Sequence, residues 1–270
     1  MIGFYYWKLV WENLYPKNIK MKDKIIVITG ASSGIGWATA EAFSQEGAKL
    51  ILCGRRKEKL ELLASKLNSK TLILTFDVRD RKAVFEALEN LPEDWKNIDV
   101  LINNAGNAHG LDPVQTANLE DWDAMIDGNV KGLMYVTKAL LPQMIESKKG
   151  HIINLGSIAG KEVYPNGSVY CSSKFAVDAF TQGLRIDLNK DGIKVGAIHP
   201  GLVQTEFSEI RFKGDQKRAA KVYEGIDALT AKDVADAILY MTKAPLHVNV
   251  ADLVLLPTRQ ANAYISNRKI

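Results

Sequence analysis

Tyr170 and Lys174 have side chains and a spacing that suit proton transfer to or from an alcohol oxygen. They are four positions apart, so in a helix both would extend from one face. A free phenol has a pKa of about 10, too high for a base at neutral pH, but a neighbouring ammonium favours the phenolate and lowers that pKa. Ser157 offers a hydroxyl that would orient the reacting oxygen. Asn129 would hold a water that links Lys174 to solvent. Each residue alone also fits an ordinary packing or surface role.

A glycine-rich segment, Thr29-Gly-Ala-Ser-Ser-Gly-Ile-Gly36, has the composition of a phosphate-binding loop. It lies between an apolar run and a helical pattern, where missing side chains let backbone N–H groups and a helix N-terminus approach a pyrophosphate. A tight turn alone would explain isolated glycines, but the strand, loop and helix follow in the required order. The predicted cofactor contacts here are Gly30, Ser32, Ser33, Gly34, Ile35 and Gly36.

Two arginines indicate which dinucleotide would bind. Where NAD-binding folds usually place an Asp or Glu for the ribose 2′-hydroxyl, this chain has Gly54-Arg55-Arg56. Guanidinium groups pair with a 2′-phosphate and stack on adenine, whereas a carboxylate would repel that phosphate. The sequence therefore predicts NADP(H) rather than NAD(H). The alternative is a solvated basic helix start.

Two further segments at predicted strand ends are expected to contact the cofactor. Asp77 and Val78 follow the third apolar run, and the Asp77 carboxylate would accept a hydrogen bond from the adenine amino group. Asn104, Ala105 and Gly106 follow the fourth run and would face the adenine ribose, with a purely structural turn as the alternative.

Short apolar runs alternate with longer helical patterns from residue 24 onward, as in repeated strand–helix–strand units with a parallel sheet. The predicted strands are 24–29, 49–53, 71–76, 99–102, 151–155, 193–198 and 251–256. The predicted helices are 34–46, 57–67, 81–91, 119–146, 168–188 and 231–241, with an irregular stretch at 206–225. This order predicts one doubly wound α/β Rossmann domain, a seven-stranded parallel sheet with helices on both faces. Ligands are expected at the carboxyl ends of its strands.

Composition excludes several other classes of function. The chain has 270 residues and a net charge of +4, with basic residues scattered rather than gathered in runs, so no nucleic-acid partner is expected. Its two cysteines, Cys53 and Cys171, have no metal-ligand spacing and suggest neither a disulfide framework nor a metal site. Four dispersed histidines also lack ligand spacing. A reducing, cytoplasmic location is expected.

The first twenty residues are rich in aromatic side chains and precede the predicted domain at 21–270. Lys8 and Glu12 interrupt the apolar run, which argues against a spanning helix, and no secretory cleavage pattern follows. Three interpretations are an upstream extension with the functional start at Met21, an interfacial anchor, and a segment that packs on a partner. The extension is the favoured one.

From residue 22 to about 257 the chain resembles the short-chain dehydrogenase/reductase family. The motifs that carry the resemblance are TGASSGIG at Thr29, NNAG at Asn103, Asn129, Ser157, YCSSK at Tyr170 and PGLVQT at Pro200. The resemblance implies that Asn129, Ser157, Tyr170 and Lys174 form a catalytic tetrad, with Tyr170 and Lys174 also touching the cofactor. It further implies cofactor contacts from Pro200, Gly201, Val203 and Thr205.

Within that family the chain is most similar to the NADP-dependent 3-hydroxy acid dehydrogenases. The similar stretches are Gly54-Arg-Arg56, Gly150-His-Ile-Ile-Asn154, Thr205-Glu-Phe and Arg211-Phe-Lys-Gly-Asp215. The resemblance implies oxidation of serine, allothreonine or 3-hydroxy acids, or reduction of malonic semialdehyde. Ser157, Tyr170 and Arg211 would contact the substrate, with Arg211 pairing with its carboxylate. A surface arginine on a mobile loop is the alternative for Arg211.

Two other functions remain open. A 3-oxoacyl or general carbonyl reductase would prefer long or carrier-bound ketones, and an NADP-binding sensor would bind the cofactor without catalysis. The long helices at 119–146 and 168–188 resemble those of the family's subunit interfaces, so a homodimer or homotetramer is expected.

Overall fold

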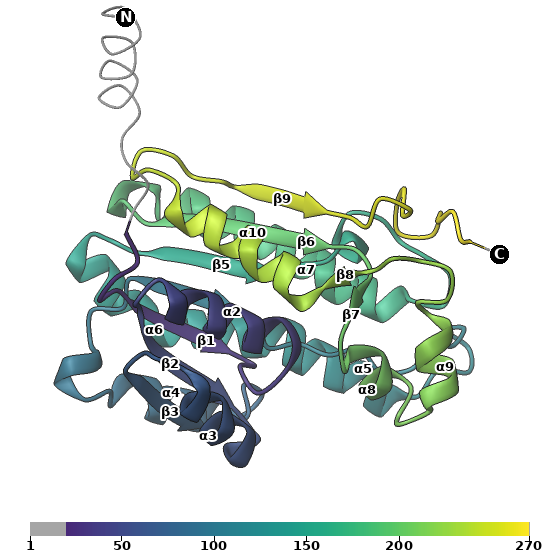
Figure 1. The fold of residues 1–270 in the computed structure, drawn as a ribbon, viewed down its shortest axis with the longest axis horizontal. Coiled ribbons are helices and arrows are strands. Elements are labelled where there is room, and N and C mark those ends of the chain that lie inside the picture. The colour runs from purple at the N-terminus through teal and green to yellow at the C-terminus, as the bar shows by residue number, and fades with distance from the viewer. Residues whose placement is uncertain (1–19, 270) are drawn as a thin grey trace, which may run out of the picture.

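Seven parallel strands form the centre of the molecule (Figure 1). The computed structural model describes residues 20–269, so the predicted N-terminal extension lies almost entirely outside the described residues. The strands are β1 (Ile25–Thr29), β2 (Lys49–Gly54), β3 (Thr71–Thr75), β4 (Val100–Asn103), β5 (His151–Leu155), β6 (Lys194–Pro200) and β9 (Asp252–Leu255). Their order across the sheet is β3-β2-β1-β4-β5-β6-β9. The predicted seven-stranded parallel sheet is confirmed.

The central strands are apolar because helices cover both of their faces. All five residues of β1, Ile-Ile-Val-Ile-Thr, are buried, and β-branched side chains fit such a pleated, covered surface. β1 pairs with β2 on one side and β4 on the other, with Val27 opposite Ile51 and Leu101. The chain order reverses between β1 and β4, so a crevice is expected at their carboxyl ends.

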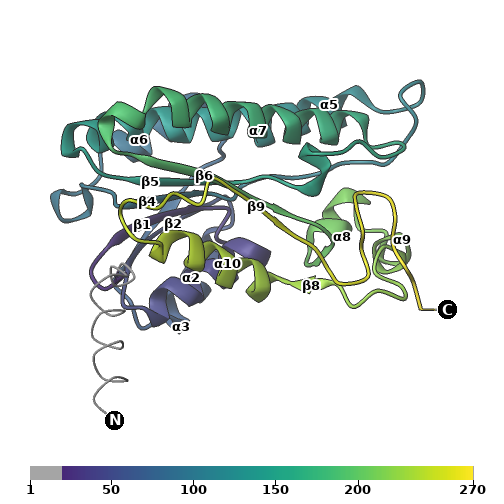
Figure 2. The ribbon, with the colours of Figure 1, turned by 90° about the horizontal axis from the view of Figure 1, so that it is seen from above.

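Two layers of helices enclose the sheet (Figure 2). One face packs against α2 (Gly34–Gln45), α3 (Lys57–Lys66) and α10 (Ala231–Lys243). The other packs against α4 (Arg81–Glu89), α6 (Leu133–Ser147) and α7 (Ser168–Asp187), with α5 (Leu119–Ile126) continuing into α6. Each face has its own apolar core, as expected for a doubly wound domain. No helix among residues 20–269 is both long and apolar enough to cross a bilayer.

The helix predicted at 119–146 is interrupted by a π-helical segment, η2 (Asp127–Gly132). Two glycines of this segment pack closely against other parts of the chain. A Cβ on Gly128 would lie 2.9 Å from the Asn107 side chain, and one on Gly132 would lie 2.7 Å from Val78. Glycine is a weak helix former, and these close approaches require it at both positions of the segment. Such tertiary contacts are not visible in a local periodicity.

The stretch predicted as irregular, 206–225, contains two short helices, α8 (Phe207–Arg211) and α9 (Gln216–Lys221). It is bracketed by β7 (Val203–Gln204) and β8 (Leu229–Thr230), which pair in a separate parallel ribbon that the sequence did not predict. The short helices η1 (Glu93–Trp95), η3 (Ile158–Gly160) and η4 (Asn189–Asp191) complete the elements. Of these, η3 follows β5 directly and positions Ser157.

Candidate active site

A cleft of about 600 Å³ opens at the carboxyl ends of the strands. Most of the predicted site residues line it: Gly30, Ser32, Ser33, Gly34, Ile35, Arg55, Arg56, Asp77, Val78, Asn104, Ala105, Gly106, Ser157, Tyr170, Lys174, Pro200, Gly201, Val203 and Thr205. Three predicted residues do not line it: Gly36, Asn129 and Arg211. The cleft thus brings the glycine loop, the arginines and the tyrosine–lysine pair together.

The glycine loop leaves a surface bare of side chains. Gly30 has φ +66°, and a Cβ on Gly36 would lie 2.4 Å from the Gly30 carbonyl oxygen, so neither position tolerates a larger residue. Ser33, at the N-cap of α2, makes no side-chain capping bond. The first N–H groups of α2 are therefore available to a phosphate. Gly36 contributes by letting β1 and α2 approach closely.

Asn104 hydrogen-bonds to the glycine loop as well as lining the cleft. Its Nδ2 donates to the carbonyl of Thr29 at 2.8 Å and to that of Gly30 at 3.2 Å. The Thr29 hydroxyl in turn accepts from the backbone N–H groups of Asn104 and Ala105. Both the turn and the cofactor interpretations of Asn104 fit this geometry, because the residue lines the cleft while holding the ends of β1 and β4 together.

Arg56 is oriented by hydrogen bonds at the far end of the cleft. Its guanidinium donates to the hydroxyls of Ser32 at 3.2 Å and Ser33 at 2.6 Å, and to Glu206 at 2.9 Å. Glu206 also accepts from Lys59 at 2.9 Å, and these partners, with Lys59 first, lower the pKa of Glu206. Sequence reasoning missed Glu206, because only the tertiary structure places it beside Arg56, 150 positions away.

Asp77 is held by arginines at the same end. Arg79 donates to both carboxylate oxygens at 3.0–3.1 Å and 2.7 Å, and Arg55 lies 3.6 Å away. Burial alone would raise the pKa of Asp77, but the bonds and charge of Arg79 outweigh it and lower the pKa. Asp77 is therefore an anionic acceptor on the cleft wall. Arg55 and Arg56 both line the cleft beside these carboxylates, and their guanidinium groups suit an anion such as a 2′-phosphate.

Tyr170 and Lys174 extend from one face of α7 into the cleft, as predicted. Burial raises the pKa of Tyr170, although a hydrogen bond with the Ser157 side chain opposes this rise. Burial lowers the pKa of Lys174 to about 8. The Lys174 Nζ donates to the Leu155 carbonyl at 2.9 Å and lies 5.9 Å from the Tyr170 ring centroid. Burial dominates the pKa of both groups here, and the predicted lowering of the Tyr170 pKa by Lys174 together with the nicotinamide charge stays a prediction.

Ser157 begins η3 immediately after β5. Its hydroxyl accepts the backbone N–H of Ala159 at 3.1 Å, and its carbonyl accepts that of Gly160 at 2.8 Å. A Cβ on Gly160 would lie 2.6 Å from the Lys174 carbonyl oxygen, so this turn packs directly on α7. The close packing places the hydroxyl beside the Tyr170 phenol.

Asn129 lies in the π-helical segment beneath the cleft. Its Nδ2 donates to the Asn107 carbonyl at 2.8 Å and to the Ser173 hydroxyl at 3.0 Å, and its Oδ1 accepts the Asn107 N–H at 2.7 Å. The side chain thus anchors the loop after β4 to α7, near Lys174. The predicted water relay through Asn129 stays a prediction.

Arg211 lies outside the cleft lining, in a smaller adjoining cavity that shares Tyr170 and His109 with it. Its Nε donates to the Gly110 carbonyl at 2.9 Å. Its guanidinium carbon lies 5.6 Å from the ring centroids of both Tyr164 and Tyr170. Arg211 is therefore ordered against the tyrosine and not a free surface arginine.

Comparison with known proteins identifies the family. The model of the short chain dehydrogenase family matches residues 24–216, and the chain belongs to that family. The NADP-dependent 3-hydroxy acid dehydrogenase YdfG of Escherichia coli strain K12 is 46% identical over 240 residues, which cover 88% of this chain and 97% of that protein. Sulfoacetaldehyde reductase 2 of Chromohalobacter salexigens is also 46% identical, over 88% of this chain and 95% of its own.

A solved structure agrees with both the fold and the cofactor. The closed form of serine dehydrogenase complexed with NADP⁺ aligns with a TM-score of 0.87 and 44% identity, covering 91% of this chain and all of that one. The chain is an NADP-dependent oxidoreductase. Its bare glycine cradle and its cluster of arginines fit the two phosphate regions of that cofactor.

Proposed function

We propose that this enzyme transfers a hydride between NADP(H) and the carbinol or carbonyl carbon of a short 3-hydroxy acid. Serine, allothreonine and 3-hydroxypropionate are candidate alcohols, and malonic semialdehyde is a candidate carbonyl. The observation that carries the proposal is the grouping of Ser157, Tyr170 and Lys174 in one cleft with the glycine loop, Arg55 and Arg56. The substrate class is supported by the names of the 3-hydroxy acid dehydrogenase and serine dehydrogenase relatives.

Each residue has one part in the reaction. When bound, NADP(H) supplies or accepts the hydride. The Ser157 hydroxyl orients the reacting oxygen, and Tyr170 gives a proton to it in reduction or takes one from it in oxidation. Lys174, as an ammonium, stabilises negative charge on that phenol. Asn129 holds the loop after β4 against α7, which keeps Lys174 at the cleft.

The raised pKa of Tyr170 gives the two directions different requirements. A phenol that stays protonated at neutral pH is ready to donate to a developing alkoxide. Oxidation needs the phenolate, so its rate should increase with pH until Lys174 loses its charge. A protonated Tyr170 therefore suits proton donation, as reduction requires, at neutral pH.

The relatives share one chemical feature in their substrates. In a 3-hydroxy acid one carbon separates the reacting carbon from the carboxylate group. In sulfoacetaldehyde one carbon likewise separates the reacting carbon from the sulfonate group. Arg211, which stacks on Tyr170, is the candidate partner for that anionic group. A sulfoacetaldehyde reductase is therefore the second candidate function, favoured by 46% identity to such an enzyme.

The test is the absorbance of NADPH at about 340 nm with purified enzyme. L-serine, L-allothreonine and 3-hydroxypropionate are assayed with NADP⁺, and malonic semialdehyde, sulfoacetaldehyde and an uncharged ketone with NADPH. Turnover of the acids supports the proposal, and turnover of the sulfonate alone supports the second candidate. A preference for the uncharged ketone would support a general carbonyl reductase. Tyr170→Phe should abolish turnover and keep NADP⁺ binding; an unaffected cellular role for that variant would indicate a sensor.

Two expectations from the sequence stay predictions. Exposed apolar side chains on α6 and α7, namely Ile145, Phe175 and Ile186, support a homo-oligomer built on these helices. Light scattering of the purified protein would give the subunit number, dimer or tetramer. The buried, unpaired cysteines Cys53 and Cys171 are compatible with a cytoplasmic location.

A further inference from the structure

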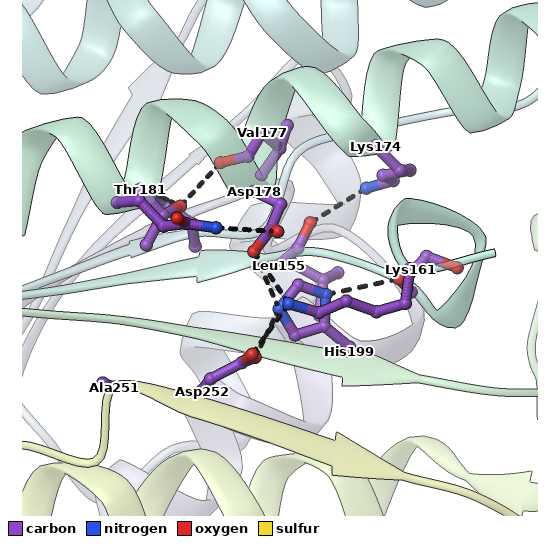
Figure 3. Close-up of polar contacts among 12 residues, drawn as sticks. Leu155, Lys161, Lys174, Val177, Asp178, Thr181, His199, Ala251 and Asp252 are labelled. Carbon is purple, nitrogen blue, oxygen red and sulfur yellow. Dashed lines mark hydrogen bonds and ion pairs between the residues drawn. The ribbon is translucent and has the colours of Figure 1, made fainter.

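His199 is a fully buried histidine near the end of β6, beside Asp178, Asp252 and Lys161 (Figure 3). Its Nδ1 lies 3.3 Å from the Ser157 carbonyl oxygen. Its Nε2 lies 2.8 Å from an oxygen of Asp252 and 3.6 Å from one of Asp178. The ring therefore connects the Ser157 backbone to two carboxylates on other elements, and the proposed chemistry gives it no part.

The Ser157 contact depends on where the ring carries a proton. A carbonyl oxygen only accepts hydrogen bonds, so the 3.3 Å contact is a hydrogen bond in the tautomer that carries its proton on Nδ1. The Ser157 carbonyl also accepts the backbone N–H of Gly160. With His199 it has donors from two elements, β6 and η3, and its direction is fixed by both. The direction of that carbonyl sets the backbone from which the Ser157 hydroxyl extends.

The ring is also packed against the preceding residue. A Cβ on Gly156 would lie 2.4 Å from the His199 Nδ1, so only glycine admits the ring at this distance. The Gly156 N–H donates to the Ile198 carbonyl at 2.8 Å, which ties the start of the loop to β6 as well. The loop between β5 and η3 is therefore held to β6 by one backbone bond and one side-chain bond.

Three charged groups face the other side of the ring: Asp178 from α7, Asp252 from β9 and Lys161 from the turn after η3. Lys161 donates to Asp178 at 3.0 Å and to Asp252 at 2.7 Å. Burial and then the Lys161 ammonium lower the pKa of His199, against the opposing effect of both carboxylates. Asp178 lies four residues after Lys174, so the cluster is built onto the helix that carries the proton-transfer pair.

We propose that His199 is a positioning residue for the reduction and oxidation reaction, acting through Ser157. The close fit against Gly156 sets the ring position, and the Nδ1–H group holds the Ser157 carbonyl. Loss of that bond lets the loop relax and weakens the hydroxyl's alignment with the reacting oxygen. This inference rests on the proposed function, in which Ser157 orients that oxygen.

Two substitutions separate the two sides of the ring. His199→Asn keeps an amide N–H near the place of Nδ1, and His199→Gln extends its amide toward the place of Nε2. We expect Gln to lower kcat about three- to tenfold, the effect of one lost hydrogen bond, with NADP⁺ affinity unchanged. Asn should retain more of kcat than Gln. His151→Gln, at a buried histidine without a hydrogen bond to the site, is the matched control and should leave kcat unchanged.

Combination with Ser157→Ala distinguishes positioning from a general loss of stability. If His199 acts through Ser157, His199→Gln lowers kcat in the natural enzyme and has no further effect in the Ser157→Ala background. Equal losses in both backgrounds, or an unchanged kcat in the single variant, would overturn the inference while leaving the proposed function intact. An unchanged kcat in Ser157→Ala alone would overturn the role of Ser157 and the inference together.

Discussion

At the scale of single residues, burial sets the protonation of the pair that carries the chemistry. The pKa of Lys174 falls to about 8, whereas that of Tyr170 rises. A lowered pKa in a base means that Lys174 carries its charge only below that value. The tyrosine keeps its proton at higher pH, so it is not the group that titrates near 8.

The reductive kcat/KM should therefore fall as pH increases through about 8, where Lys174 becomes neutral. Lys174→Arg keeps its charge, so its normalised profile should lack this decrease. Initial rates with NADPH between about pH 6 and 10 test both enzymes, since kcat/KM reports groups of the free enzyme. A natural enzyme whose profile stays flat beyond pH 9 would show that the Lys174 charge is not required.

Arg211 gives a prediction about substrate choice. Arg211→Met removes the guanidinium beside Tyr170, and a charge-assisted hydrogen bond contributes about 1.5–3 kcal/mol. KM for carboxylate or sulfonate substrates should increase about tenfold or more, and KM for an uncharged ketone should change little. Arg218→Met, at an exposed arginine of the same segment, is the control. An unchanged KM for the acids would exclude Arg211 as their partner.

At the scale of elements, the sequence predicts what local composition determines. The apolar run of β1 and the glycines after it predicted a covered strand and a bare loop, and both are present. The π-helical break at Asp127–Gly132 was not predicted, and its two glycines pack closely against Asn107 and Val78 from other parts of the chain, which a local periodicity does not show. Glu206 beside Arg56 was missed for the same reason.

His151 in strand β5 makes the free energy of unfolding depend on pH. Burial, followed by the charge of Lys194, lowers the pKa of this histidine to about 3, and neither ring nitrogen has a hydrogen-bond partner. The unfolded chain binds a proton here below about pH 6.5 while the folded chain does not. The free energy of unfolding is therefore unaffected by His151 above pH 6.5. It decreases as the pH falls from 6.5 toward 3, because protonation of His151 then favours the unfolded chain.

His151→Phe should remove this dependence. At pH 5 the natural protein should have lost about 2 kcal/mol of unfolding free energy through this residue, at about 1.4 kcal/mol per pKa unit, and the variant should not. Urea unfolding at pH 7 and pH 5 measures the difference, with the exposed His247→Phe as control. An equal loss between the two pH values in the natural protein and in His151→Phe would contradict the assignment.

At the scale of the whole molecule, the end of the chain returns to the site. After β9 the backbone contacts the loop of residues 200–205, and its last described residues contact residues 222–225, which follow α9. The Gln260 side chain accepts the backbone N–H of Leu202 at 2.8 Å. Arg268 donates to the Val222 carbonyl at 3.1 Å, and the Lys269 N–H to that of Gly225 at 2.9 Å. The C-terminal residues thus hydrogen-bond to the backbone at Leu202, Val222 and Gly225.

Substitution of Gln260 tests whether the contact between the C-terminal segment and Leu202 supports cofactor binding. It is 7% exposed, and Leu202 lies between Gly201 and Val203 on the cleft wall. Gln260→Ala leaves the Leu202 N–H without its partner, a loss of about 1–1.5 kcal/mol. The Kd for NADP⁺, measured by calorimetry, should therefore increase about tenfold. Tyr264→Ala, at a residue 61% exposed on the same tail, should leave it unchanged. Equal Kd values for Gln260→Ala and the natural enzyme would show that the loop of residues 200–205 holds its shape without its bond to Gln260.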